Sequence, residues 1–220
     1  MFLDYDKLHT CLLLKFTVYN KKYIRHFYRT HYIFLADKKM TKTVAIEDKK
    51  IIEQIKIEYR RRGWIRDLLL FVLTINTGIK LTELLKLKVC DIKNKKELII
   101  KETFTKIKKA FPLSEEIQEL VKEYTKNRKS KEPLFISRVG KSIDRIQVFR
   151  NFKEICVELE IEKKYSVSSW RKTFGYHYYK KYGDLAILEW IFNQSTIAET
   201  LKFIGIKEDI NSHLNREFCL

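Results

Sequence analysis

A strongly apolar segment from Trp64 to Ile75 constrains the fold more than any other part of the chain, because almost all of its side chains must be buried. Its charged residues, Arg66 and Asp67, lie near its start. Gly78 follows closely, and glycine readily takes the positive φ that ends a helix. The sequence therefore predicts a buried core helix that stops at Gly78.

Helical periodicity recurs on both sides of this segment. Upstream, apolar residues from Thr43 onward recur at roughly helical spacing, with Glu53 and Lys56 on the outer face. Downstream, similar apolar stripes alternate with turn signals such as Gly140 and Gly183. The further helices expected are 81–89, 114–124, 143–159, 168–182, 184–192 and 197–203.

Two short apolar runs interrupt the helical pattern. Leu98–Ile100 and Ala110–Leu113 are expected to be strands on either side of a basic stretch, Lys101–Lys109. Pro112 suits the end or the edge of a strand, because proline has no backbone N–H to donate. The predicted fold class is therefore mainly α with a small antiparallel β-sheet, an α+β arrangement.

The formal net charge is +17, and the apolar content of 45% is enough for a buried core. Such a charge favours an anionic polymer or surface as the partner. Charge by itself does not separate DNA from RNA or from a membrane. No membrane-spanning segment is expected, because Lys15 cuts short the early apolar run Cys11–Leu14.

The four cysteines, Cys11, Cys90, Cys156 and Cys219, are scattered and form no Cys-x-x-Cys pair. Neither a zinc site nor a redox-active pair is therefore predicted. We expect reduced, mostly buried thiols in a cytoplasmic protein that needs no metal or cofactor.

The chain contains three motif segments, Ile75–Leu87, Ser168–His177 and Ile191–Ile206. Together they resemble the catalytic domain of the tyrosine recombinases, or phage integrases. The first is Ile75–Leu87, in which Lys80 stands where that family has a catalytic arginine before a leucine-rich helix. The second is Ser168–His177, which reads SSWRKTFGYH and is similar to a subgroup motif HSLRKTFGYH. Arg171 therefore matches a catalytic arginine, and Ser168 replaces a histidine.

The third stretch, Ile191–Ile206, resembles the segment that carries the nucleophile in the family. Gln194 stands where a histidine is expected, and Phe203 stands where the nucleophilic tyrosine is expected. The separation of 32 residues between Arg171 and Phe203 is close to the separation usual in the family. The resemblance spans about 43–208 and implies the tyrosine-recombinase fold.

The resemblance implies attack by a tyrosine hydroxyl on a DNA phosphate, which gives a covalent phosphotyrosyl link. Phe203 has no hydroxyl, and no tyrosine occurs from Gly183 to Leu220. Lys80 keeps a positive charge but clamps phosphate oxygens less well than a bidentate guanidinium. Ser168 and Gln194 can hydrogen-bond a phosphate, but they do not exchange protons near neutral pH as histidine does.

The family also carries a hairpin lysine that acts as general acid, and Lys106 is the expected substitute here. An ungapped match backwards from Pro112 reaches Phe104, and Lys106 lies two residues on, on the same face of a strand. Catalytic positions are therefore assigned to Arg171, Lys80 and Lys106, with Ser168, Gln194 and Phe203 as degenerate positions.

Double-stranded DNA is the partner that the resemblance and the charge favour together, through contacts with the phosphate backbone. Basic residues of the first two motifs and of the hairpin are expected to make these contacts. They are Lys80, Lys101, Lys106, Lys108, Lys109, Arg171 and Lys172.

Other conspicuous residues are expected to be structural. His177 fits a packed or hydrogen-bonded core histidine, and Trp170 and Trp190 lie on apolar helical stripes. The run Arg60–Arg62 fits a solvated helix end, with contact to a DNA backbone as the alternative.

Residues 43–208 are predicted to form one tyrosine-recombinase-like domain, with a short tail at 209–220. Residues 1–42 are either a basic arm that touches DNA or a leader upstream of a second start at Met40. The leading hypothesis is a DNA-binding, cleavage-deficient protein of a mobile element, phage or plasmid. The alternatives are an active recombinase with an atypical nucleophile, and a helical module that binds a partner recombinase or itself through Asn211–Leu220.

Overall fold

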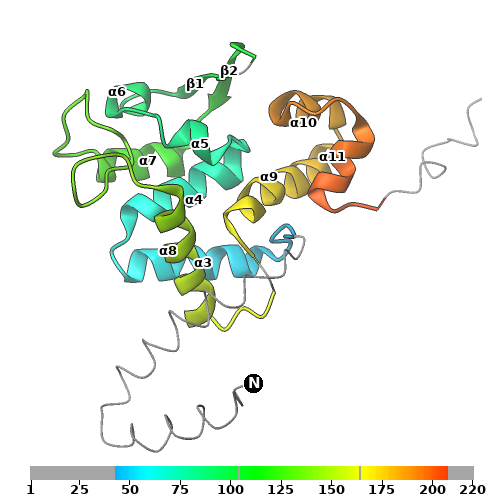
Figure 1. The fold of residues 1–220 in the computed structure, drawn as a ribbon, viewed down its shortest axis with the longest axis horizontal. Helices are drawn as coiled ribbons and strands as arrows, with labels where there is room; N and C mark the ends of the chain where they lie inside the picture. The colour runs from blue at the N-terminus through cyan, green and yellow to red at the C-terminus, as the bar shows by residue number, and fades with distance from the viewer. Residues whose placement is uncertain (1–42, 104, 164, 208–220) are drawn as a thin grey trace, which may run out of the picture. The chain divides into compact units, whose positions relative to one another are not determined.

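The computed structural model describes residues 43–207 with the exception of 104 and 164 (Figure 1). The predicted N-terminal extension and C-terminal tail therefore lie outside the described residues. Within the described part, helices dominate and one two-stranded antiparallel sheet is present, which confirms the predicted fold class. The helices are α3 Lys49–Arg61, α4 Ile65–Thr77, α5 Leu81–Leu84, α6 Val89–Ile92, α7 Glu115–Tyr124, α8 Arg145–Glu158, α9 Val167–Tyr182, α10 Leu185–Phe192 and α11 Ile197–Ile204.

Helix α4 is the buried centre of the fold, as the apolar segment predicts. Every residue from Asp67 to Thr74 is buried, and α4 packs against α3, α7 and α9. Gly78 caps the helix in the left-handed region at φ 65°, and its N–H donates to the carbonyl of Thr74. The predicted end of this helix is therefore confirmed.

The expected helix 81–89 is wrong. After α5, the backbone around Leu87 turns away and binds a distant segment instead of continuing the helix. Leu134 N donates to Leu87 O at 2.7 Å, and Val89 N donates to Glu132 O at 3.0 Å. These backbone groups are satisfied by a short bridge to residues 132–134, so the leucine-rich pattern is split between α5 and α6.

The sheet consists of β1 Glu97–Lys101 and β2 Lys108–Pro112, paired antiparallel. Pro112 ends β2 as predicted. Side chains alternate between the two faces of a strand, so Leu98, Ile100 and Phe111 enter the core. The opposite face is exposed, and on it Lys101 lies directly across from Lys108.

Trp170 of α9 holds three helices together. Its side chain is fully buried, and its ring lies edge-on to Phe71 of α4 at 5.3 Å and to Phe152 of α8 at 5.0 Å. Such edge-to-face pairs add to the stabilisation that the buried area provides. The expectation that Trp170 belongs to the core is confirmed.

The arginines at the end of α3 form ion pairs within the protein. Arg61 donates to Glu58 at 2.7 Å, and Arg62 donates to Glu58 at 2.6 Å and to Glu154 of α8 at 2.7 Å. The Arg61 guanidinium, followed by that of Arg62, lowers the pKa of Glu58 to about 2. This end of α3 is therefore tied to α8 through charged side chains.

The two described cysteines differ in environment. Cys156 is buried, and burial raises the pKa of its thiol to about 12. Cys90 is exposed, so the expectation of mostly buried thiols fails there. In the described part of the chain, no helix has the length and apolar character needed to cross a membrane.

Substitution of Gly78 by alanine is expected to destabilise the fold more than substitution of Gly183. Both glycines end a helix at positive φ, 65° and 70°, where an added Cβ costs about 1–2 kcal/mol. At Gly78 that Cβ would also lie 2.4 Å from Cδ1 of Phe174, whereas nothing lies within 4 Å at Gly183. Urea unfolding should therefore show that Gly78→Ala lowers the free energy of unfolding by about 1–3 kcal/mol more than Gly183→Ala does. Equal losses would contradict a tight α4–α9 contact.

Candidate functional site

Arg171 brings the three motif segments together. It follows the core anchor Trp170 on α9, and Nε donates to the carbonyl of Gly78 at 2.7 Å. Nη2 donates to the carbonyl of Ile191 on α10 at 3.1 Å. The single guanidinium therefore links the loop after α4, the N-terminal part of α9 and the end of α10, which are separate segments of the sequence.

Phe203 of α11 lies beside this guanidinium. The Arg171 Cζ atom is 4.6 Å from the ring centroid of Phe192 and 5.8 Å from that of Phe203. The two rings contact each other edge-on at 5.0 Å. Burial lowers the pKa of Arg171 to about 10, with the nearby Glu102 carboxylate acting in the opposite direction. Arg171 therefore remains a cation at neutral pH although it is largely desolvated.

Lys172 is buried rather than presented to solvent, since 9% of it is exposed. Its Nζ donates to the carbonyl of Thr43 at 2.5 Å and lies 5.4 Å from the Phe203 ring. The hydroxyls of Thr43 and Ser168 also share a hydrogen bond of 3.0 Å. Ser168 is exposed, and Lys172 contributes to the interior next to Arg171.

The segment 43–46 is held along α9 by further polar contacts. Ile46 N donates to Oγ1 of Thr173 at 2.8 Å, and Nε2 of His177 lies 2.9 Å from the carbonyl of Ile46. This hydrogen bond confirms the structural interpretation of His177. One face of α9 therefore binds the start of the described chain, while Arg171 faces α10 and α11.

Lys109, which was expected to contact DNA, is buried in this structure, since 1% of it is exposed. Lys108 and Lys109 are adjacent in a strand, so their side chains leave opposite faces, and Lys109 lies opposite buried Ile100. Nζ donates to Oε1 of Glu102 at 3.1 Å, to Oδ1 of Asn193 at 2.7 Å and to the carbonyl of Trp190.

The two predicted phosphate-binding cations, Lys80 and Arg171, lie near Lys109. Burial lowers the pKa of Lys109, the Glu102 carboxylate raises it, and the charges of Arg171 and Lys80 lower it further. Lys80 is half-buried at the start of α5. Of these three cations, Lys109 contacts the Glu102 carboxylate directly, and Arg171 is influenced by its charge.

The remaining hairpin lysines are exposed. Lys101 and Lys108 face each other on the outer side of the sheet. Lys106 lies in the loop between the strands at φ 58°, so the expectation that it occupies a strand face is wrong. No described contact joins these three lysines to Arg171.

Gln194 lies in the turn between α10 and α11. Its N–H donates to the carbonyl of Glu189 at 3.1 Å, and its Nε2 donates to the carbonyl of Glu199 at 3.4 Å. The buried Oε1 atom has no hydrogen-bond partner in the described part. Trp190 is 44% exposed, so its expected place in the core is wrong. Its ring centroid instead lies 4.7 Å from Nζ of Lys109.

Sequence reasoning missed Glu102 and Asn193. Asn193 ends α10 in the left-handed conformation, and its Nδ2 donates to Oε2 of Glu102 at 2.6 Å. The available signals were a single acid inside a basic hairpin and an asparagine after an apolar helix, a common left-handed cap. Neither signal reveals that the two residues meet.

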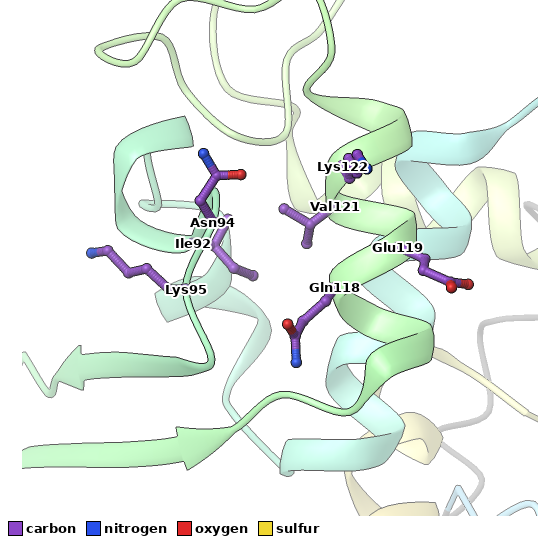
Figure 2. A pocket seen from close by; sticks show the side chains of 7 residues that line it. All are labelled: Ile92, Asn94, Lys95, Gln118, Glu119, Val121 and Lys122. Atoms are coloured by element: carbon purple, nitrogen blue, oxygen red, sulfur yellow. The ribbon is translucent and has the colours of Figure 1, made fainter.

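The other features of the described surface do not add to this site. Among the described residues, no group of three or more His, Cys, Asp or Glu side chains could hold a metal ion. A pocket between the α6–β1 segment and α7 is lined by none of the predicted site residues (Figure 2). Its lining residues are Ile92, Asn94, Lys95, Gln118, Glu119, Val121 and Lys122.

A sequence profile described as the phage integrase family matches residues 28–209. The chain belongs to the phage integrase family. The match begins inside the segment that was expected to be an extension. This integrase-family chain is also 39% identical over 145 residues to the "Probable integrase/recombinase YoeC" of Bacillus subtilis (strain 168). That alignment covers 66% of this chain and 80% of the relative.

Solved structures of recombinases share the fold of this integrase-family chain. XerA recombinase matches with a TM-score of 0.66 at 16% identity, over 81% of this chain and 67% of that one. XerH bound to a difH substrate matches with a TM-score of 0.63 at 18% identity, over 79% of this chain and 53% of that one. A Tn1549 transposon integrase variant in complex with transposon right end DNA matches with a TM-score of 0.61 at 16% identity. This match covers 80% of this chain and 65% of that one. The chain thus spans about half to two thirds of these proteins.

Lys109→Ala is expected to lower the free energy of unfolding by about 3–5 kcal/mol, because it leaves the Glu102 carboxylate without its buried partner. Lys108→Ala removes the exposed neighbour and should change stability by less than about 0.5 kcal/mol. Urea denaturation at neutral pH measures both. Similar small effects would show that Lys109 is a surface lysine in solution.

Proposed function

We propose that this integrase-family protein binds double-stranded DNA through its backbone but does not cleave it. The observation that supports the loss of cleavage is Phe203, whose ring lies 5.8 Å from the Arg171 guanidinium. The family resemblance places the nucleophilic tyrosine at this position. Without a hydroxyl, this side chain cannot form the covalent phosphotyrosyl intermediate.

The neighbouring substitutions support the same conclusion. Lys80 provides positive charge near Lys109, but it lacks the planar pair of donors with which an arginine holds two phosphate oxygens. Ser168 and Gln194 replace two histidines, and both of them are engaged in hydrogen bonds within the protein. Neither of them can act as an acid or base near neutral pH. Binding charge is therefore retained, whereas proton transfer and nucleophilic attack lack their groups.

DNA binding is supported by the exposed side of the hairpin. Lys101 and Lys108 are directly opposite each other on one face, and Lys106 extends the charge into the loop. Like charges across a strand pair repel each other, so an anion between them would relieve a cost of the free protein. DNA phosphates supply such anions, and the net charge of +17 favours the encounter.

The structural neighbours provide a chemical parallel. Structures exist of Tn1549 integrase variants with a tyrosine replaced by phenylalanine, or an arginine replaced by lysine, in complex with DNA. Substitutions of these types therefore allow that integrase to hold DNA. We propose that this chain acts on a mobile element, phage or plasmid as an accessory or regulatory factor in integration or recombination.

A duplex gel shift at two salt concentrations should detect binding that weakens steeply as salt rises. The double variant Lys101→Ala with Lys108→Ala is expected to bind more weakly. It should also reduce the slope of log affinity against log salt by about 2, because two phosphate contacts are lost. Substituting Lys122 and Lys126, which are exposed on and after α7, provides a control of equal charge. No shift of any duplex at low salt would contradict the proposal.

A nicked suicide duplex carrying the sequences that flank the coding region should yield no covalent adduct with the natural protein. The combined variant Phe203→Tyr, Lys80→Arg, Ser168→His and Gln194→His is expected to form one, because the nucleophile, the clamp and the proton-transfer groups return together. Denaturing gels and peptide mapping measure the product. An adduct with the natural chain would instead support an active recombinase with an atypical nucleophile.

A further inference from the structure

The Glu102 carboxylate lies directly after β1 and is fully engaged by neighbouring donors. Oε1 accepts from Nζ of Lys109 at 3.1 Å, and Oε2 accepts from Nδ2 of Asn193 at 2.6 Å. Oε2 also accepts from the hydroxyl of Thr105 at 2.8 Å. Because 12% of its side chain is exposed, Glu102 is an internal anion rather than a surface acid.

The charge of this carboxylate is preserved at neutral pH. Burial raises the pKa of Glu102, but the hydrogen bonds from Thr105, Asn193 and Lys109 lower it to below its usual value. The carboxylate also acts on Arg171, whose pKa burial lowers and Glu102 raises. Glu102 is therefore a negative charge beside a cluster of cations, Lys80, Lys109 and Arg171, of which Lys109 contacts it directly.

A phosphate diester would present the same kind of oxygens to these cations as the carboxylate presents to Lys109. A carboxylate and a phosphate both present two oxygens to lysine and arginine donors. Two anions in one desolvated place repel strongly, so the cluster can hold the carboxylate or the phosphate but not both. The occupant seen in the structure is the carboxylate.

The hairpin end that carries Glu102 is held by few main-chain bonds. Glu102 N donates to the carbonyl of Ile107 at 3.0 Å, and Lys106 N donates to the carbonyl of Glu102 at 3.2 Å. Lys106 has φ 58°, which is unfavourable for a side chain with a Cβ. On the outer face, the repulsion between Lys101 and Lys108 also opposes this closed hairpin end.

We propose that Glu102 is an internal competitor of DNA, which pairs with Lys109 beside the cations Lys80 and Arg171 until a backbone phosphate displaces it. Asn193 holds Glu102 in that position from the end of α10. This inference rests on the proposed DNA binding. It adds that the affinity for DNA is limited by Glu102, an acid of the chain itself. Removing this acid is expected to strengthen binding more than removing one negative charge elsewhere on the protein.

Three variants distinguish competition by Glu102 from the general effect of its negative charge on DNA binding. Glu102→Gln removes the charge with little change in size. Asn193→Gly removes one hydrogen bond to the carboxylate at constant net charge, and glycine accepts the φ of 52° at this position. Glu97→Gln is the charge-matched control, because Glu97 is exposed at the other end of β1.

Titrations with duplex DNA at low salt test the inference by measuring the dissociation constant of each variant. We expect the dissociation constant to fall by about tenfold or more for Glu102→Gln, because a charge-assisted contact no longer competes. Asn193→Gly should lower it by about threefold, and Glu97→Gln by about twofold or less. An effect of Glu102→Gln no larger than that of Glu97→Gln would overturn the inference while DNA binding by the natural protein still stands.

The remaining outcomes are equally decisive. If neither the natural protein nor any variant shifts a duplex at low salt, the proposed function fails and the inference fails with it. Binding by Glu102→Gln and Asn193→Gly but not by the natural protein would support the inference that Glu102 opposes binding, and would overturn the proposed DNA binding by the natural protein. Should Glu102→Gln fail to fold, Asn193→Gly decides. Without DNA, the hydrogen-bonded amides of Glu102, Lys106 and Ile107 should exchange hydrogen faster in Asn193→Gly than in the natural chain, and unchanged exchange would overturn the inference.

Discussion

The packing of α9 against α4 through Trp170 is the contact on which the site depends. Trp170 is clamped between Phe71 and Phe152, and the next residue in the chain is Arg171. Because the indole ring is fixed in the core, the guanidinium one residue on is directed to Gly78 and toward α10. Core packing and the geometry of the site are thus set by one turn of helix.

Cations that were expected on a DNA-binding surface lie inside the protein. Arg171 and Lys172 donate to main-chain carbonyls, and Lys109 pairs with Glu102. Burying a charge is costly unless donors and acceptors are matched, and here each cation has such partners. The exposed lysines of the hairpin and the buried cluster are therefore two different sources of positive charge. In the proposed mechanism, the first meets DNA directly, and the second becomes available when Glu102 moves.

Sequence patterns predicted most of the helices because apolar periodicity and capping residues act locally. Gly78 and Gly183 end their helices in the left-handed region, and Ser114 and Asp184 cap the helices that follow them. The expected helix 81–89 failed because its backbone groups bind residues 132–134, which no local pattern reveals. The burial of Lys109 was not predicted, because a run of basic residues conceals the alternation of a strand.

The sequence by itself determined the family and the missing hydroxyl at Phe203, because both follow from the identity and order of side chains. It also determined that cationic groups outnumber anionic ones. Only the tertiary structure decided which of these cations are exposed and which anion they meet. Glu102 and Asn193 are 91 residues apart, and their contact exists because the hairpin and the end of α10 pack against the same buried lysine. Such contacts depend on long-range packing, which local sequence patterns do not encode.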